Sequence, residues 1–235
     1  MTLDYVDMVG HYQMGAAVHA VFIGNSVACG YNGKDWERIP GISLQNGKLV
    51  PDYRESNIPQ SAPTMLRKVL QGRNPGSTVV NLCGISWDTN DHLGISTPHS
   101  MIAGQTNTIE EIKRLPVRPD VAFIALQIND AGHGLSIDMF TANTHRMIGE
   151  LNVLGIKSVL VKENYTTIAG YAAFVDKVDC IAKTWKIPVI DTYTPSFNRP
   201  ELLSDYAHPN AKGHDLIFSQ YQKWLNYYGP PTTSN

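Results

Sequence analysis

The sequence lacks any apolar run that approaches the ~20 residues a membrane-spanning helix needs. It also lacks an excess of one charge, because 19 Lys and Arg stand against 21 Asp and Glu. Because there is no surplus of basic residues, the composition does not indicate binding to nucleic acid or to an anionic membrane surface. The acidic start, residues 1–7, has neither a basic head nor a long apolar core, so no secretory signal is predicted. We expect partners other than nucleic acid or membrane. For the compartment two alternatives remain: the protein is cytoplasmic, or it is exported as part of a larger assembly.

Cysteine is scarce, and its placement is not that of a disulfide framework or a zinc site. Cys29, Cys83 and Cys180 are odd in number, far apart and flanked by apolar residues. We expect buried free thiols. Four histidines show no defensible ligand spacing and are expected on the surface or satisfied in the core: His92, His99, His133 and His214. No metal site is predicted.

Strand-like apolar runs alternate with helical patterns along most of the chain. Strands are predicted over residues 19–24, 78–83, 120–126, 158–161 and 188–191, and helices over about 64–71, 106–115, 137–154, 171–185 and 210–227. This alternation is typical of βαβ units, so we predict an α/β fold with helices on both faces of a parallel sheet. The 235 residues, 43% of them hydrophobic, can build one full core, and residues 1–235 are expected to form a single domain.

Residues 31–60 break this alternation, with too many Gly, Pro and Asn residues for a long helix. Loops of this length in a compact domain are usually functional, so we assign this one to shaping the substrate cleft. A small hairpin around Asn46-Gly47 is the structural alternative. The loop also holds polar and aromatic side chains that suit the face of a sugar: Tyr31, Trp36, Arg38, Tyr53 and Arg54.

A candidate nucleophile follows the first predicted strand. The apolar run ends in Gly24-Asn25-Ser26, and a buried strand that stops there delivers the Ser26 hydroxyl to the edge of the sheet. The alternative is that Ser26 merely caps the helix that follows.

Polar residues also follow the second, third and fifth predicted strands, at the edge where the site of an open parallel sheet lies. A serine there needs a base, and the base needs a partner that fixes its tautomer. His208 and Asp205 supply these two groups. Asp130 and His133 have the same spacing, but we favour His208 because Pro209 is placed to start the final helix and orient the preceding turn.

The order of these blocks resembles the SGNH hydrolase superfamily, also called the GDSL esterase and lipase family. Residues 24–26 match its first block, a glycine follows the second strand, Asn129-Asp130 matches the third block, and Asp205 to Pro209 matches the last. The resemblance spans almost the whole chain. It implies a three-layer α/β/α sandwich with a five-stranded parallel core sheet, flavodoxin-like in architecture, and ester hydrolysis through an acyl-serine.

The resemblance makes Ser26 the nucleophile, His208 the general base and acid, and Asp205 its orienting partner. It builds the oxyanion hole from three donors. These are the Ser26 amide, the side chain of Asn129, and an amide of the second block, either Gly84 or Trp87. Trp87 could instead form a wall of the acyl pocket. Asn129 could be only a turn residue and Asp130 only a helix N-cap. No metal or organic cofactor is required.

The sequence departs from the family pattern in three places. Asn25 stands where the family usually has aspartate, and Gln127 stands where it usually has glycine. In the second block, alignment on Asp88-Thr89 puts Trp87 at the usual oxyanion glycine, whereas alignment on Asn81 puts Gly84 nearer that role. Our candidates for binding the substrate are Asn25, Gln127, Trp36 and Tyr53.

We predict a serine esterase that removes a short acyl group, in particular acetyl, from a carbohydrate, either a small molecule or a polysaccharide. The short acyl group is favoured because the sequence has no long apolar lid. Acyl-thioesterase or lysophospholipase activity is the nearest alternative, and a catalytically inactive carbohydrate-binding domain is another. A flavodoxin-like nucleotide-binding protein would share the architecture, but no glycine-rich phosphate loop follows the first strand.

Overall fold

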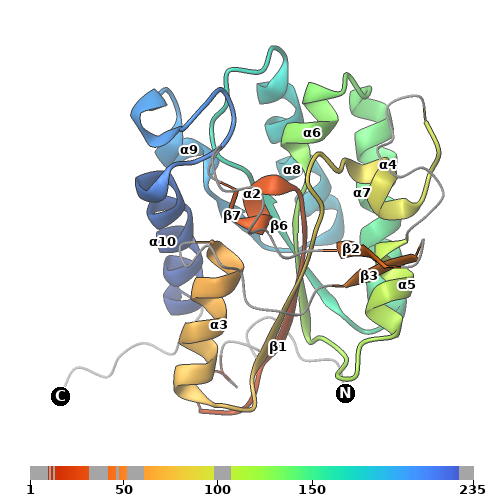
Figure 1. Ribbon diagram of the computed structural model, residues 1–235, viewed down its shortest axis with the longest axis vertical. Helices are drawn as coiled ribbons and strands as arrows, with labels where there is room; N and C mark the ends of the chain where they lie inside the picture. Colours follow the sequence, from red (N-terminus) through yellow and green to blue (C-terminus); the bar gives the residue numbers. More distant parts are fainter. Residues whose placement is uncertain are drawn as a thin grey trace.

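The computed structural model describes residues 14–31, 61–97 and 107–227, with Gly10, Tyr12 and the backbone of two strands between residues 42 and 51 (Figure 1). Several candidate residues from the sequence lie outside the described residues: Trp36, Arg38, Tyr53, Arg54 and His99.

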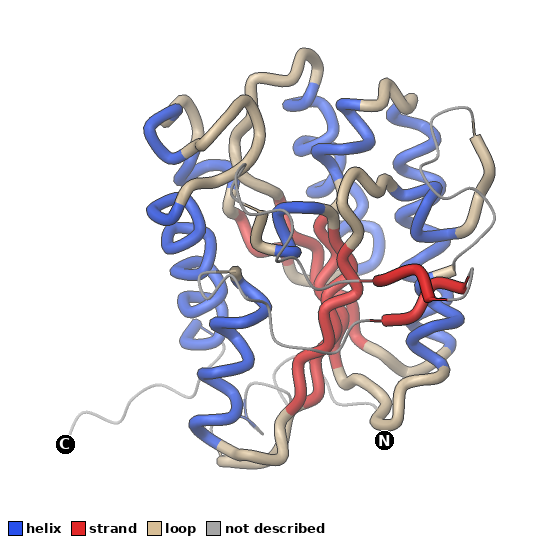
Figure 2. Tube along the Cα trace, in the orientation of Figure 1, coloured by secondary structure: helices blue, strands red, loops and turns tan. Residues whose placement is uncertain are grey.

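A five-stranded parallel sheet forms the centre of the structure, with the strand order β4-β1-β5-β6-β7 (Figure 2). Its strands are β1 (His19–Gly24), β4 (Thr78–Cys83), β5 (Val121–Ala125), β6 (Lys157–Lys162) and β7 (Val189–Asp191). The predicted α/β fold with a five-stranded parallel core is therefore confirmed, and the strand bounds agree with the expected ones to within one residue.

The central strands are apolar along their whole length because both faces of the sheet are covered. In β1, Ala20 and Phe22 belong to one hydrophobic cluster and Val21 and Ile23 to the other. Successive side chains of a strand point to opposite faces, so one run of apolar residues supplies both cores.

Helices cover the two faces as separate layers (Figure 1). On one side lie α3 (Ala62–Arg73) and α10 (Ala211–Tyr227), which contact each other. On the other lie α5 (Thr108–Lys113), α7 (Ile137–Val153) and α8 (Tyr171–Trp185). These five helices are the ones that the sequence predicted.

Short helical segments lie between the carboxyl ends of the strands and the long helices, and the sequence indicated only the one after Ser26, as part of the alternative role of Ser26 as a cap. They are α2 (Ser26–Cys29), α4 (Thr89–Leu93), α6 (Gln127–Gly132), α9 (Tyr193–Ser196) and the 3-10 turn η2 (Pro200–Leu202). Each is too short to show a helical period in the sequence.

The strand order creates a crevice at one end of the sheet. From β1 the chain goes first to β4 on one side and later to β5 on the other. The connections after β1 and β5 therefore diverge, and ligands of open α/β sheets bind at such a point.

The hairpin alternative for residues 31–60 is confirmed for the backbone. Strands β2 (Ile42–Gln45) and β3 (Lys48–Pro51) pair antiparallel on either side of Asn46-Gly47 in the sequence.

Within the described ranges, the helices are all too short or too polar to reach across a lipid bilayer.

The prediction of buried free thiols is wrong for Cys29 and Cys83, which are buried but not free, and half right for Cys180. Cys29 at the end of α2 and Cys83 at the end of β4 form a disulfide, with their Cα atoms 5.4 Å apart. The strand register sets Cys83 beside Gly24, and the turn of α2 returns Cys29 to the same place. No local pattern indicated this pairing, because 54 positions separate the two residues. Cys180 is free but exposed.

We expect the disulfide to stabilise the fold by restricting the unfolded chain. For a loop of this length the chain-entropy relation gives about 4 kcal/mol, and native disulfides usually contribute about 2–4 kcal/mol. The double variant Cys29→Ser/Cys83→Ser should therefore unfold at a clearly lower urea concentration than the wild type. Cys180→Ser is the matched control and should unfold with the wild type. Identical midpoints for all three proteins would show that the cross-link contributes nothing.

Candidate active site

Ser26 lies on a sharp turn between strand and helix. It is the first residue of α2, directly beyond the N-cap Asn25, whose Oδ1 accepts from the Val27 amide at 2.9 Å. Gly24 is needed here, because a Cβ atom at that position would overlap Ala28. Asn25, not Ser26, caps the helix, so the alternative role of Ser26 as the cap is not what the structure shows.

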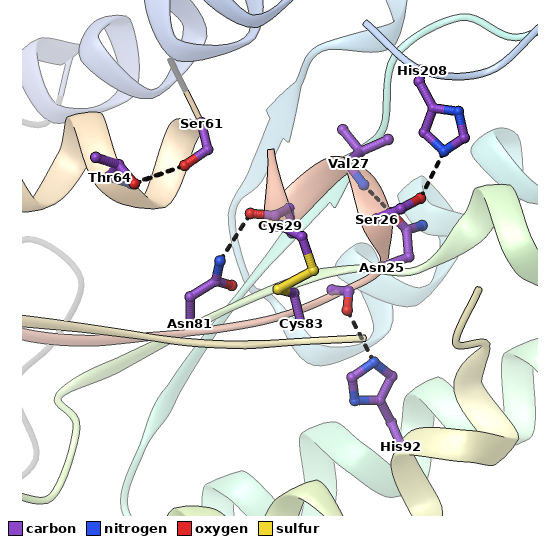
Figure 3. The surroundings of a disulfide bond; sticks show 12 residues. Asn25, Ser26, Val27, Cys29, Ser61, Thr64, Asn81, Cys83, His92 and His208 are labelled. Carbon is purple, nitrogen blue, oxygen red and sulfur yellow. Dashed lines mark hydrogen bonds between the residues drawn. A yellow bond between two sulfur atoms is a disulfide. The ribbon is translucent and has the colours of Figure 1, made fainter. Parts of the chain in front are cut away.

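Ser26, His208 and Asp205 form a continuous chain of hydrogen bonds, with His208 in the middle. His208 Nε2 lies 2.9 Å from Ser26 Oγ, and His208 Nδ1 lies 2.7 Å from Asp205 Oδ2. Figure 3 shows both ends of α2, with Ser26 turned toward His208 and Cys29 joined to Cys83. The structure thus brings together the three residues that the sequence nominated.

Asp205 is held ionised by its neighbours. Partial burial alone would raise the pKa of its carboxyl, but hydrogen bonds from His208 and Ala207 outweigh this and lower the pKa. Oδ1 accepts from the amides of Ala207 and His208, both at 2.8 Å, while Oδ2 takes the ring. A carboxylate at Nδ1 keeps the proton on that nitrogen, so Nε2 is free to accept the proton of Ser26.

Tyr31 and His214 support the His208 imidazole from the side. The Tyr31 ring meets the His208 ring edge-on, with centroids 4.6 Å apart. His214 Nε2 lies 3.3 Å from the Tyr31 carbonyl oxygen, and burial lowers the pKa of His214 to about 4. His214 is therefore a neutral residue of the core. The expectation of a satisfied core histidine holds for Nε2 only, because Nδ1 is buried with no hydrogen-bond partner among the described residues.

Asn129 faces the site from α6. Its Nδ2 donates to the Trp87 carbonyl at 2.8 Å, which occupies one of its two N–H bonds and leaves the other. Asn129 is thus a helical residue and not a turn residue. Asp130 does not cap its own helix: its carboxylate accepts from the amide of Thr89 at 3.0 Å and from the Thr89 hydroxyl at 2.6 Å, at the start of α4.

The two amides considered for the second block are already engaged. The Gly84 amide donates to the Gly24 carbonyl at 2.9 Å, and the Trp87 amide donates to the Gly84 carbonyl at 3.2 Å. Ser86, with a positive φ of 62°, lies between them and lines the cavity at Ser26. Its amide donates to no residue in the described part of the chain.

Trp87 packs inward and not into the cavity. It is 5% exposed, its ring meets His92 edge-on, and a Cβ atom on Gly84 would overlap its indole. This packing does not fit the alternative role of Trp87 as an acyl-pocket wall. Burial lowers the pKa of His92 to about 4, so its neutral ring can donate from Nε2 to the Gly24 carbonyl and accept at Nδ1 from Thr108.

Glu163, which the sequence analysis missed, ties three strand ends together beneath the site. The side chain follows β6, is fully buried, and accepts from Asn25 Nδ2 at 2.7 Å and from the Ile128 amide at 2.9 Å. The Glu163 amide in turn donates to Gln127 Oε1 at 2.9 Å. Its position after the fourth predicted strand, like that of the other polar residues, is the signal that could have found it.

Asn25 and Gln127 therefore belong to the interior, which corrects their prediction as substrate-binding residues. Both are at most 1% exposed, and neither is among the described residues that line the cavity. Both side chains bond to Glu163: Asn25 donates to its carboxylate, and Gln127 accepts from its backbone amide.

A cavity of about 260 Å³ opens beside Ser26. Its described lining includes Tyr31, Ile85, Ser86, Asn129, His133, Ile168, Tyr206 and His208. Nowhere in the described ranges do three or more potential metal-ligating side chains come together.

This layered fold, with its serine, imidazole and carboxylate at the switch point of the sheet, defines a hydrolase of the SGNH type. The family model of the GDSL-like Lipase/Acylhydrolase family matches residues 22–216, and the chain belongs to that family.

Solved structures with the same fold are distant in sequence. A member of the lipolytic protein G-D-S-L family from Veillonella parvula DSM 2008 is 16% identical, with 88% of this chain and 97% of that chain covered and a TM-score of 0.60. A catalytic mutant of Axe2, an acetylxylan esterase from Geobacillus stearothermophilus, is 17% identical, with coverage of 90% and 96% and a TM-score of 0.61. CEX, a two-domain esterase active on acetylated mannans, is 13% identical, with coverage of 96% and 53% and a TM-score of 0.61. No curated protein matches the chain.

We expect Asn25 and Glu163 to be strongly coupled. Asn25→Asp would place a second carboxylate where an amide now donates, and two buried carboxylates in contact should cost about 3 kcal/mol or more of folding stability. Adding Glu163→Gln restores complementarity, because the introduced glutamine amide can donate to the introduced carboxylate and accept from the Ile128 amide. Urea unfolding of the wild type, both single variants and the double variant measures the coupling. The double variant should be more stable than Asn25→Asp alone, and additive losses would contradict the pairing.

The free energy of unfolding should also depend on pH through the titration of Glu163. Burial raises the pKa of its carboxyl from 4.5 to about 7. Between these values the folded protein holds a proton that the unfolded chain has lost, so stability falls as the pH rises through this window. From pH 4.5 to 8 the wild type should lose about 3 kcal/mol relative to Glu163→Gln. His92 and His214 titrate in both proteins and cancel in the comparison. Parallel stability curves would show that Glu163 does not titrate in this range.

Proposed function

We propose that this protein is a serine esterase that removes a short acyl group, in particular acetyl, from a carbohydrate. The observation that carries the proposal is the hydrogen-bonded row of Ser26, His208 and Asp205 at the wall of a cavity. An imidazole so oriented can take the serine proton as the hydroxyl attacks an ester.

The reaction then proceeds in two halves. Ser26 Oγ adds to the ester carbonyl while its proton passes to His208 Nε2, and collapse of the adduct releases the alcohol, which takes that proton. Water next attacks the acyl-serine, giving its proton to His208, and the acid leaves as the proton returns to Ser26. Asp205 stabilises the charged imidazole in both halves.

The oxyanion that forms in each half needs donors aimed at it. We assign this role to the amides of Ser26 and Ser86 and to the free N–H bond of Asn129. Ser86 replaces Gly84 and Trp87 in this assignment because the amides of those two residues already donate to backbone carbonyls. Removing one such donor typically costs about 3–4 kcal/mol of transition-state stabilisation.

A short acyl group and a sugar fit the described part of the cavity. Its volume of about 260 Å³ is small for a long acyl chain. Tyr206, which is 62% exposed beside His208, offers an aromatic face to a sugar ring. Axe2 and CEX act on acetylated polysaccharides, which supports this choice of substrate. Trp36 and Tyr53 remain candidate contacts outside the described residues. We further propose that residues 1–235 form one domain, whose chemistry requires no cofactor.

Hydrolysis of p-nitrophenyl esters tests the proposal. The wild type should release p-nitrophenol from the acetate faster than from the octanoate, and Ser26→Ala should lose at least about 10³-fold in kcat because the nucleophile is gone. Ser219→Ala, on α10, is the matched control and should retain full activity.

Other outcomes distinguish the alternatives. A preference for octanoate would point to an acyl-thioesterase or a lysophospholipase. No turnover of any ester would favour an inactive carbohydrate-binding domain. Equal rates for the wild type and Ser26→Ala would remove Ser26 from the mechanism.

A further inference from the structure

A second Asp–His pair lies at the cavity, apart from that of Asp205 and His208. His133 Nδ1 is 2.9 Å from Asp88 Oδ2, with the Asp88 side chain fully buried and the His133 side chain 20% exposed. His133 follows α6, one helical turn beyond Asn129, and its ring forms part of the wall that also contains Ser26 and His208. The proposed mechanism leaves this imidazole unused.

Asp88 fixes the orientation of the His133 ring. The N-cap of α4 is Asp88, whose Oδ1 accepts from the amides of Asn90 at 2.8 Å and Asp91 at 3.2 Å. Its Oδ2 is then directed at His133, so the ring keeps a proton on Nδ1 and turns Nε2 to the opposite side. Among the residues that the structure describes, none pairs with His133 Nε2.

The charges around His133 favour a hydroxyl as its ligand. With Nδ1 protonated, Nε2 accepts a hydrogen bond when the ring is neutral and donates one when the ring is charged. The hydrogen bond to Asp88 raises the pKa of His133 above its usual value, against the effect of burial. A hydroxyl can pair with either form. An anion would pair only with the charged form, and it would be opposed by Asp88 and Asp91, both on or next to α4.

We propose that His133, held by Asp88, binds a free hydroxyl of the alcohol part of the ester. This inference rests on the proposed function. A short acyl group such as acetyl carries no hydroxyl, so the bound group must belong to the alcohol. The substrate class is then a partially acylated polyol, in which a free hydroxyl lies near the ester, and not a simple alkyl ester.

His133→Asn separates this role from a structural one. The Asn side-chain amide can stand where Nδ1 stands and still donate to Asp88, but it has nothing at the position of Nε2. The variant should therefore fold like the wild type, which urea unfolding checks. The variant His133→Phe is less suitable, because it would leave the Asp88 carboxylate buried without its partner.

The assay compares two esters that share their acyl group and ring: a monoacetylated methyl xylopyranoside with free hydroxyls, and the same compound with those hydroxyls methylated. For the first ester, His133→Asn should lower kcat/KM about tenfold, mainly by raising KM. A tenfold change corresponds to the free energy that one lost hydrogen bond usually costs. On the methylated ester and on p-nitrophenyl acetate, the variant should match the wild type within about twofold.

Three results would overturn the subsite while leaving the esterase intact. The first is an equal loss by His133→Asn on all three esters, which would give His133 a role in the reaction itself or in folding. The second is a wild-type enzyme that cleaves p-nitrophenyl acetate but does not prefer the hydroxylated sugar ester. The third is a His133→Asn variant that equals the wild type on the hydroxylated ester. Failure of the wild type on every ester would instead remove the proposed function, and the subsite with it.

Discussion

The hydrogen bond between Ser26 and His208 joins residues that are 182 positions apart, and the rest of the structure serves to bring them together. Ser26 stands where β1, the second strand of the sheet, ends, and His208 stands in a loop just before the last helix. The loop is closed by a hydrogen bond from the Ser204 amide to the His208 carbonyl at 2.8 Å. A parallel sheet places all its carboxyl ends on one side, so the two segments can meet only because every strand runs the same way.

The turn that carries Ser26 is held from below by groups that share the end of the sheet. Gly24 accepts from Gly84 and His92, and Asn25 donates to Glu163. Each is a buried polar group with a partner, as burial requires. Since Glu163 also accepts from the Ile128 amide, the turn of Ser26 and the helix of Asn129 are both bonded to the same carboxylate. One side chain that follows a third strand thus helps to place the proposed nucleophile relative to the proposed oxyanion donor.

Much of the fold could be predicted from the sequence, because long apolar runs and helical periods are strong local signals. Residues that act through distant contacts could not. The disulfide of Cys29 and Cys83 depends on strand register, and Glu163 acquires its role only when β6 is set beside β5. The trio of serine, histidine and aspartate was found from the order of short blocks along the chain. The free amide at Ser86 could not be predicted, because it depends on the backbone conformation of a loop in which Ser86 has a positive φ.

The contact of Asn25 with Glu163 has a consequence for the family as a whole. An amide at one position and a carboxylate at the other are complementary, whereas two carboxylates are not. A relative with aspartate at the position of Asn25 should therefore carry an uncharged or protonated partner at the position of Glu163. Among homologues, these two columns of an alignment should covary, and the residue after the fourth core strand would then indicate how the turn after the first strand is held in a given relative.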